Sequence, residues 1–157
     1  MNGQLEISFE DFRRTDTWEV AQMNQTITAL NTSSDEADPI LIYIDGAGCR
    51  PDGKGSGWAW IQSRSGQQLI EQIDGLTNRQ AEYLALISAL FALPNGSSAQ
   101  IFTDSRVMWD EVAGHCRVRD PKLGALLLLV CTLTKEKDLK IYLRWIPRRK
   151  NLAGKLL

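Results

Sequence analysis

The hydrophobic pattern changes its period near Thr77, and this change restricts the fold more than any other feature of the chain. Upstream, the segments 40–44, 57–62 and 68–74 have the short apolar or alternating patterns of β-strands. Downstream, apolar residues recur at helical spacing as far as Phe91, and Pro94 follows. Thr77 and Gln80 have the spacing of a capping box, which marks the start of that helix. The pattern predicts a mixed α/β domain.

The remaining residues continue this alternation. The segment 99–103 predicts a strand, 105–112 a short helix, 121–135 a longer helix that begins at a proline, and 139–145 the last strand. Residues 148–157 predict the beginning of a further helix. Trp58, Trp60 and the leucines of 126–129 are assigned to packing. We therefore expect one domain over residues 39–157.

Residues 1–38 have a different character and predict an acidic appendage and linker. They carry eight acidic and two basic side chains, a net charge of −6, whereas residues 135–157 carry two acidic and eight basic side chains, a net charge of +6. Apolar residues recur at 5–12 and 18–30, but the pattern does not decide between helix and strand. The acidic start is placed to pair with the basic end.

Several classes of protein are excluded by composition. The chain of 157 residues has three cysteines without a CxxC pair and a single histidine, His115, so a disulfide scaffold or a zinc site is not expected. His115 is assigned to a solvated loop. The longest apolar stretch, 123–133, is shorter than the roughly 20 residues that span a bilayer. We expect a cytoplasmic monomer with no membrane partner.

Three carboxylates follow or interrupt apolar segments. Asp45 and Asp104 each end a predicted strand, and Glu82 is placed in the first turn of the predicted helix. Taken singly, such acids are typical of caps and turns. If the three converge at one edge of a sheet, their mutual repulsion requires divalent cations, and oxygen ligands favour Mg²⁺ or Mn²⁺.

Four sequence blocks now support a resemblance. They are IYIDGA at 42–47, GKGSG at 53–57, LTNRQAEYLAL at 76–86 and FTDS at 102–105. In this order, they resemble the successive motifs of the type 1 ribonuclease H family, and the blocks at 112–123 and 145–149 are similar to its compact prokaryotic branch. The resemblance implies an α/β, ribonuclease H-like fold, in which helices flank a five-stranded mixed sheet whose first three strands are antiparallel.

The resemblance also implies an activity: hydrolysis of the RNA strand of RNA–DNA hybrids to 5′-phosphate and 3′-hydroxyl products, with two Mg²⁺ or Mn²⁺ ions present together with substrate. Asp45 matches the acid that bridges both metals, and Glu82 and Asp104 match the acids of the leaving-group metal. The family's fourth acid aligns with Gly154, which supplies no ligand. Asn151, three residues earlier, is a candidate to offer an amide oxygen to the metal instead.

Substrate contacts are expected from loops and helix ends near these acids. The candidate substrate-binding residues are Gly46, Arg50, Lys54, Asn78, Arg79, Gln80, Ser105, Arg117, Arg119 and Arg148. Any one basic cluster is more typical of a solvated face than of a phosphate contact, whereas three clusters beside the acids favour a phosphate track.

The sequence is compatible with two main hypotheses for the function. The first is a metal-dependent endonuclease for RNA–DNA hybrids. The second is a catalytically reduced module that binds nucleic acid or a protein partner without cleavage, because Gly154 removes one ligand. A third, an exonuclease or transposase-like relative, uses the same scaffold.

Overall fold

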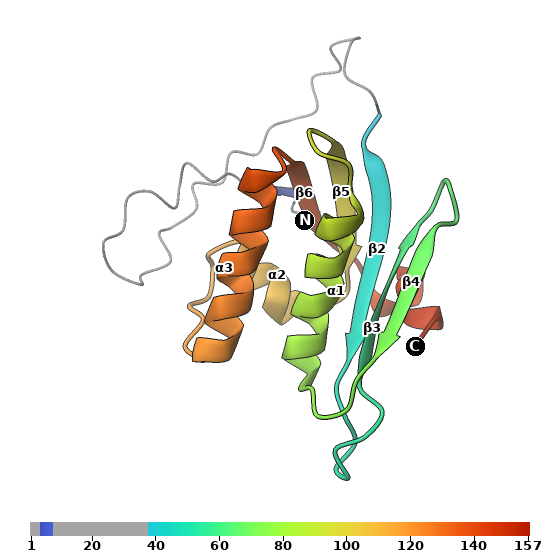
Figure 1. Cartoon of the computed structure of the whole chain (residues 1–157), viewed down its shortest axis with the longest axis vertical. Coiled ribbons are helices and arrows are strands. Elements are labelled where there is room, and N and C mark those ends of the chain that lie inside the picture. Colours follow the sequence, from blue (N-terminus) through green and yellow to red (C-terminus); the bar gives the residue numbers. More distant parts are fainter. Residues whose placement is uncertain (1–3, 8–37) are drawn as a thin grey trace.

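The computed structural model describes residues 4–7 and 38–157, and these residues form one mixed sheet with helices packed against it (Figure 1). The strand order is β1-β6-β5-β2-β3-β4. The strands are β1 (Gln4–Ile7), β2 (Ile40–Ala47), β3 (Gly57–Gln62), β4 (Gln68–Gln72), β5 (Ser98–Thr103) and β6 (Lys140–Trp145). The expectation for 18–30 lies outside the described residues, and so does that for 8–12.

The five predicted strands are all present in the expected arrangement. β2, β3 and β4 pair antiparallel, and β5 lies between β2 and β6, parallel to both. The ribonuclease H-like fold class is therefore confirmed. The chain adds a sixth strand, β1, which pairs antiparallel with β6 from Gln4 opposite Arg144 to Ile7 opposite Ile141. Part of the segment that gave no clear period thus extends the sheet.

α1 (Asn78–Ala92) begins at the predicted capping box. The Thr77 side chain accepts from the Gln80 amide at 3.2 Å, and the Gln80 side chain accepts from the Thr77 amide at 2.9 Å. These two bonds satisfy helix-terminal N–H groups that otherwise lack partners. Gln80, a predicted substrate-binding residue, therefore has its amide oxygen committed to the cap.

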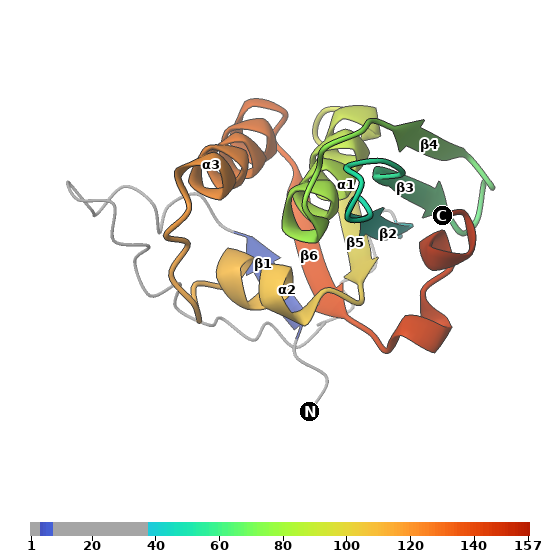
Figure 2. The same cartoon turned by 90° about the horizontal axis from the view of Figure 1, so that it is seen from below.

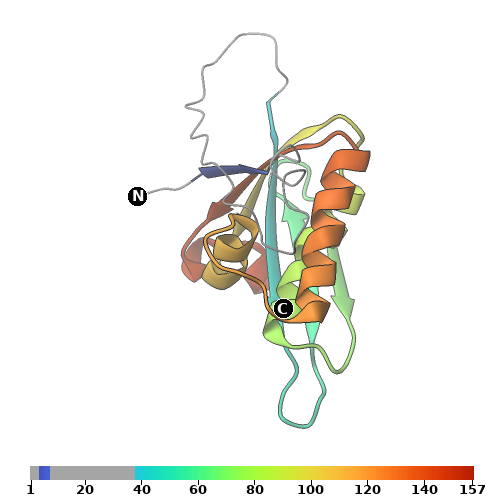
Figure 3. The same ribbon diagram turned by 90° about the vertical axis from the view of Figure 1, so that its left-hand side faces the viewer.

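α1 and α3 (Pro121–Glu136) lie side by side against one face of the sheet, and α2 (Arg106–Val112) follows β5 (Figures 1 and 2). Figure 3 shows α3, in orange, on one side of the sheet. Asp120 caps α3 and accepts from the Lys122 amide at 2.8 Å. Among the described residues, no helix combines the length and apolar character needed to cross a membrane.

The core lies between these helices and the sheet. Ile42, Ile44, Tyr83, Leu90 and Ile101 are fully buried there. Trp60 belongs to this core and Trp58 packs against it, as predicted.

Some apolar residues assigned to packing are exposed instead. Leu128 is 51% exposed and Leu129 37%, so packing is wrong for these two side chains. The apolar stripes of α1 and α3 are wider than the area that neighbouring elements cover, so side chains at their edges are exposed.

The chain ends in two 3₁₀ turns, η2 (Arg148–Lys150) and η3 (Ala153–Lys155), where a single helix was predicted. Asn151 separates them because its backbone is extended, with φ −80° and ψ 110°. Its side-chain oxygen accepts from the Ala153 amide at 3.1 Å, as a cap for the second turn. η3 lies against β2 and β3, across the sheet from α1 (Figure 2).

Candidate active site

The three predicted carboxylates meet at one edge of the sheet. One ligand oxygen from each of Asp45, Glu82 and Asp104 lies within 4.8 Å of the others. They come from three different elements: β2, α1 and the residue that follows β5. This separation of oxygens suits a divalent cation that binds carboxylates directly.

Backbone pairing places the two aspartates. The parallel ladder between β2 and β5 ends at the pair Tyr43 and Phe102, while β2 continues alongside β3 as far as Ala47. Asp45 and Asp104 each follow their ladder residue by two positions, so they stand where the two strands separate. A crevice at the carboxyl ends of parallel strands is the usual ligand position in α/β sheets.

Gly46 brings Glu82 to the aspartates. A Cβ atom at Gly46 would lie 2.3 Å from the Ala81 carbonyl carbon and the Glu82 amide nitrogen, so only glycine allows α1 to approach β2 so closely. The prediction of Glu82 in the first helical turn is wrong. Because α1 begins at Asn78, Glu82 lies in the second turn, and close packing rather than the helix terminus sets its position.

The cluster is electrostatically unfavourable without a cation. Burial, together with the charge of Asp104, raises the pKa of Asp45 from 3.8 to about 6. Burial and the two aspartates raise the pKa of Glu82 from 4.5 to about 9, and Arg148 opposes both shifts. Glu82 Oε2 is buried and has no hydrogen-bond partner. A buried carboxylate oxygen without a donor, beside two other carboxylates, fits a metal ligand.

Asn151 has a different place from the one predicted. It is 1% exposed, and its amide nitrogen, not its oxygen, faces the acids. Nδ2 donates to Ile44 O at 2.8 Å and to Asp104 Oδ1 at 3.1 Å, while the oxygen is occupied by the Ala153 amide. The prediction of Asn151 as a metal ligand through its amide oxygen is therefore wrong, and the residue orients Asp104.

Gly154 lies directly beside Asp45, as the alignment with the fourth acid implied. A Cβ atom there would lie 3.2 Å from Asp45 Oδ2. A side chain at this position would therefore point at the carboxylate cluster. The cluster has no acid on this side among the described residues.

An open pocket surrounds the acids, and half of the predicted substrate-binding residues line it. These are Gly46, Asn78, Arg79, Ser105 and Arg148. Asn78 Oδ1 accepts from the Gly48 amide at 2.5 Å, so it also fixes the glycine-rich loop. The Ser105 side chain caps α2 by accepting from the Met108 amide.

The other predicted contacts lie outside the residues that line this pocket. Arg50 is exposed and pairs with Asp52, and Lys54 is exposed in the same loop. Arg117 and Arg119 are exposed in the loop between α2 and α3. In that loop, His115 is exposed but contacts Asp110 through Nδ1 at 3.3 Å, so the expectation of a purely solvated ring was incomplete.

Two residues that sequence reasoning missed also bear on the pocket. Arg106 lines it, pairs with Asp110 and lies over the ring of Trp109 at 4.7 Å from the centroid. Glu111 is buried and forms an ion pair with Arg79. No local pattern marks Glu111 as a partner of Arg79, because the two residues lie on different helices.

The sequence of this chain matches that of a known protein family. The RNase H family model matches residues 37–147. The chain belongs to the ribonuclease H family. The match ends before the segment that contains Asn151 and Gly154.

Solved structures of the family are similar over most of the chain. The N-terminal RNase H domain of Rv2228c from Mycobacterium tuberculosis is 25% identical, with a TM-score of 0.65, over 76% of this chain and 91% of that one. RNase H1 from Halobacterium salinarum is 26% identical, with a TM-score of 0.62, over 76% and 94% of the two chains. LC11 RNase H1 in complex with an RNA/DNA hybrid is 26% identical, with a TM-score of 0.63, over 75% and 92%.

Proposed function

We propose that this ribonuclease H chain is a metal-dependent endonuclease that hydrolyses the RNA strand of RNA–DNA hybrids and leaves 5′-phosphate and 3′-hydroxyl ends. The observation that carries the proposal is the convergence of Asp45, Glu82 and Asp104 within 4.8 Å. The hybrid bound to LC11 RNase H1 supports the choice of substrate. We also propose that the cations are Mg²⁺ or Mn²⁺ and that two ions bind together with substrate. We further propose that the protein is a cytoplasmic monomer.

Asp45, Glu82 and Asp104 would hold the cations. When bound, such cations supply a deprotonated water as nucleophile and stabilise the leaving oxygen. Asn151 orients Asp104 through its amide nitrogen. Arg148 lines the pocket and offsets part of the negative charge, so it favours a phosphate beside the acids.

The remaining predicted contacts extend this surface. Asn78 and Ser105 line the pocket and offer hydrogen bonds to a bound strand. Arg50, Lys54 and the arginines at 117 and 119 are exposed in loops and are candidates for outer contacts with backbone phosphates.

A second candidate function is binding of nucleic acid without cleavage, and Gly154 is the observation that favours it. The position faces Asp45 but provides no carboxylate. A site with one negative charge fewer holds the cation on the water side more weakly. Cleavage is therefore expected to be slower than with a complete set of four acids.

The deciding experiment is cleavage of an end-labelled RNA–DNA hybrid, with RNA duplex and DNA duplex as controls, in Mg²⁺ and separately in Mn²⁺. The wild-type chain is compared with Asp45→Asn, and Asp138→Asn serves as the matched control. Asp138 is exposed and has a positive φ of 51°, which asparagine also tolerates. We expect cleavage of the hybrid alone, lost by about a thousandfold or more in Asp45→Asn, which is several kcal/mol of transition-state stabilisation.

Other outcomes separate the two candidates. Hybrid binding that weakens with salt, without cleavage in either metal, would favour the binding module. Cleavage that persists in Asp45→Asn would show that the acids are not the site.

A further inference from the structure

Glu111, in the last turn of α2, is a buried carboxylate that the proposed reaction does not use. Its side chain is only 3% exposed. Both of its oxygens have partners: the Tyr83 hydroxyl donates to Oε2 at 3.0 Å, and the Arg79 guanidinium pairs with Oε1. Burial raises the pKa of Tyr83, so its hydroxyl remains a hydrogen-bond donor.

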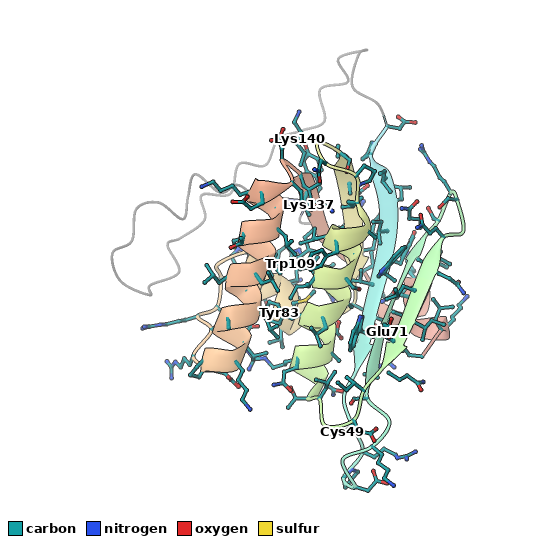
Figure 4. All side chains as sticks on the ribbon, in the orientation of Figure 1. Cys49, Glu71, Tyr83, Trp109, Lys137 and Lys140 are labelled. Carbon is teal, nitrogen blue, oxygen red and sulfur yellow. The ribbon has the colours of Figure 1, made fainter. Side chains whose placement is uncertain are left out.

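α1 presents both partners to Glu111 from one side. Arg79 and Tyr83 are four residues apart in this helix, which places them on the same face. Tyr83 is fully buried and, in Figure 4, lies in the region between α1 and α3 together with Trp109 of α2. Glu111 thus forms a polar connection between the core and the start of α1.

Arg79 extends from this buried carboxylate to the open pocket. Its side chain is 44% exposed, and it lines the pocket beside Asn78 and Glu82. A guanidinium has five N–H donors in one plane, so an ion pair with a single carboxylate leaves donors available on its other edges. Those donors are positioned for a group that enters the pocket.

The ion pair between buried Glu111 and half-exposed Arg79 is weak evidence for a stabilising role. Taking the Glu111 charge out of water costs about as much as its attraction to Arg79 returns, and apolar residues often serve a core equally well. A preset guanidinium, however, binds without first losing side-chain freedom. Planar guanidinium groups match phosphate oxygens well.

We propose that Glu111 is a positioning residue that, together with Tyr83, holds the Arg79 guanidinium ready to bind a backbone phosphate of the substrate beside the carboxylates. This inference rests on the proposed function. It adds a phosphate contact that sets where the bound nucleic-acid strand lies relative to the carboxylates. It makes Arg79 the binding group, with Glu111 acting only through it.

A double-mutant cycle tests this role. Arg79→Ala, Glu111→Gln and the double variant are made in the Asp45→Asn background, and the affinity for a fluorescent RNA–DNA hybrid is measured by anisotropy. We expect about tenfold weaker binding for Arg79→Ala and about threefold for Glu111→Gln, in line with a charged hydrogen bond. The double variant is expected to bind no more weakly than Arg79→Ala, because Glu111 has no effect without Arg79.

The same substitutions in the active chain separate positioning from chemistry. We expect KM to rise in the same proportions while kcat stays within about twofold. Glu136→Gln at the exposed end of α3 and Arg64→Ala in the exposed β3–β4 turn are matched controls and are expected to change neither constant. Tyr83→Phe provides a milder variant, with about twofold weaker binding, if Glu111→Gln does not fold.

Two results would overturn the positioning role. One is a lowered melting temperature for Glu111→Gln or Tyr83→Phe with unchanged hybrid affinity. The other is an equal loss of affinity from Glu111→Gln with and without Arg79. A wild-type chain that neither binds nor cleaves the hybrid would overturn the proposed function as well, whereas cleavage that is insensitive to Glu111 would overturn only this inference.

Discussion

The two sides of Asp45 are built by different means. On one side, α1 supplies Glu82 and the residue after β5 supplies Asp104, within the part of the chain that matches the family model. On the other side, residues 148–157 form two 3₁₀ turns, after that match has ended. The first side has two acids, whereas the second has Gly154 beside Asp45 and Asn151 bonded to Ile44 and Asp104.

The residues on the two sides of the site are held in position in different ways. Strand ladders and helix packing fix the acids of the first side through many backbone bonds, and Gly46 allows the close approach of α1 that this packing needs. The second side depends on one buried amide, Asn151, which joins β2, Asp104 and η3.

The largest effect is expected from Asn151→Ala. It removes hydrogen bonds to Ile44, Asp104 and Ala153 from a residue that is 1% exposed. Loss of these buried bonds should lower the free energy of unfolding by about 2–4 kcal/mol, measured by urea denaturation. Asn95→Ala, at an exposed turn, should cost less than about 1 kcal/mol. Equal costs would mean that the amide does not hold the second side.

The affinity of the site for a metal ion should depend on pH, because Asp45 and Glu82 have raised pKa values. In the metal-free protein, the pKa of Asp45 is raised to about 6 and that of Glu82 to about 9, so both acids must lose protons when a cation binds. Affinity for Mn²⁺ is therefore expected to rise with pH between about 6 and 9, by at most about tenfold per unit for each proton released. Titration calorimetry in buffers of different ionisation enthalpy measures the protons, and a flat pH profile would contradict the raised values.

Gly154→Asp should make the two sides more alike. The new carboxylate would lie against Asp45. Its Cβ atom would be 3.2 Å from Asp45 Oδ2, a distance that a small shift of the Asp45 side chain accommodates. We expect tighter Mg²⁺ binding and about tenfold faster hybrid cleavage, which is comparable to the effect of one supporting metal-site group. Gly154→Asn, of the same size without the charge, is the control. Unchanged kinetics in Gly154→Asp would show that three acids suffice.

The smallest effect concerns stability without metal. The folded chain holds a proton on Glu82 up to a pKa of about 9, whereas the unfolded chain releases it near 4.5, so the folded state loses stability as the pH rises between these values. Glu82→Gln removes this loss. In EDTA at pH 8 we expect the melting temperature of Glu82→Gln to exceed that of the wild type by a few degrees, with little difference at pH 4. A wild type that is the more stable chain at pH 8 would contradict the buried charge.

Much of the fold was predictable because it depends on local pattern. The capping box at Thr77 and the proline at the start of α3 each fix a boundary by short-range chemistry. The predicted C-terminal helix failed because Asn151 uses its side chain to connect distant elements. Such a bond spans 107 positions of sequence and leaves no periodic signal.

The candidate site divides in the same way. The sequence by itself determined the three acids, the helix that carries Glu82, and the glycine that aligns with the family's fourth acid, whereas Asp45 lies within β2 rather than at the end of the predicted strand. Only the tertiary structure decided that Asn151 presents its nitrogen to the acids and that Glu111 holds Arg79. The physical reason is that residue type limits what a side chain can donate or accept, whereas the partner it meets depends on how separate helices and strands pack.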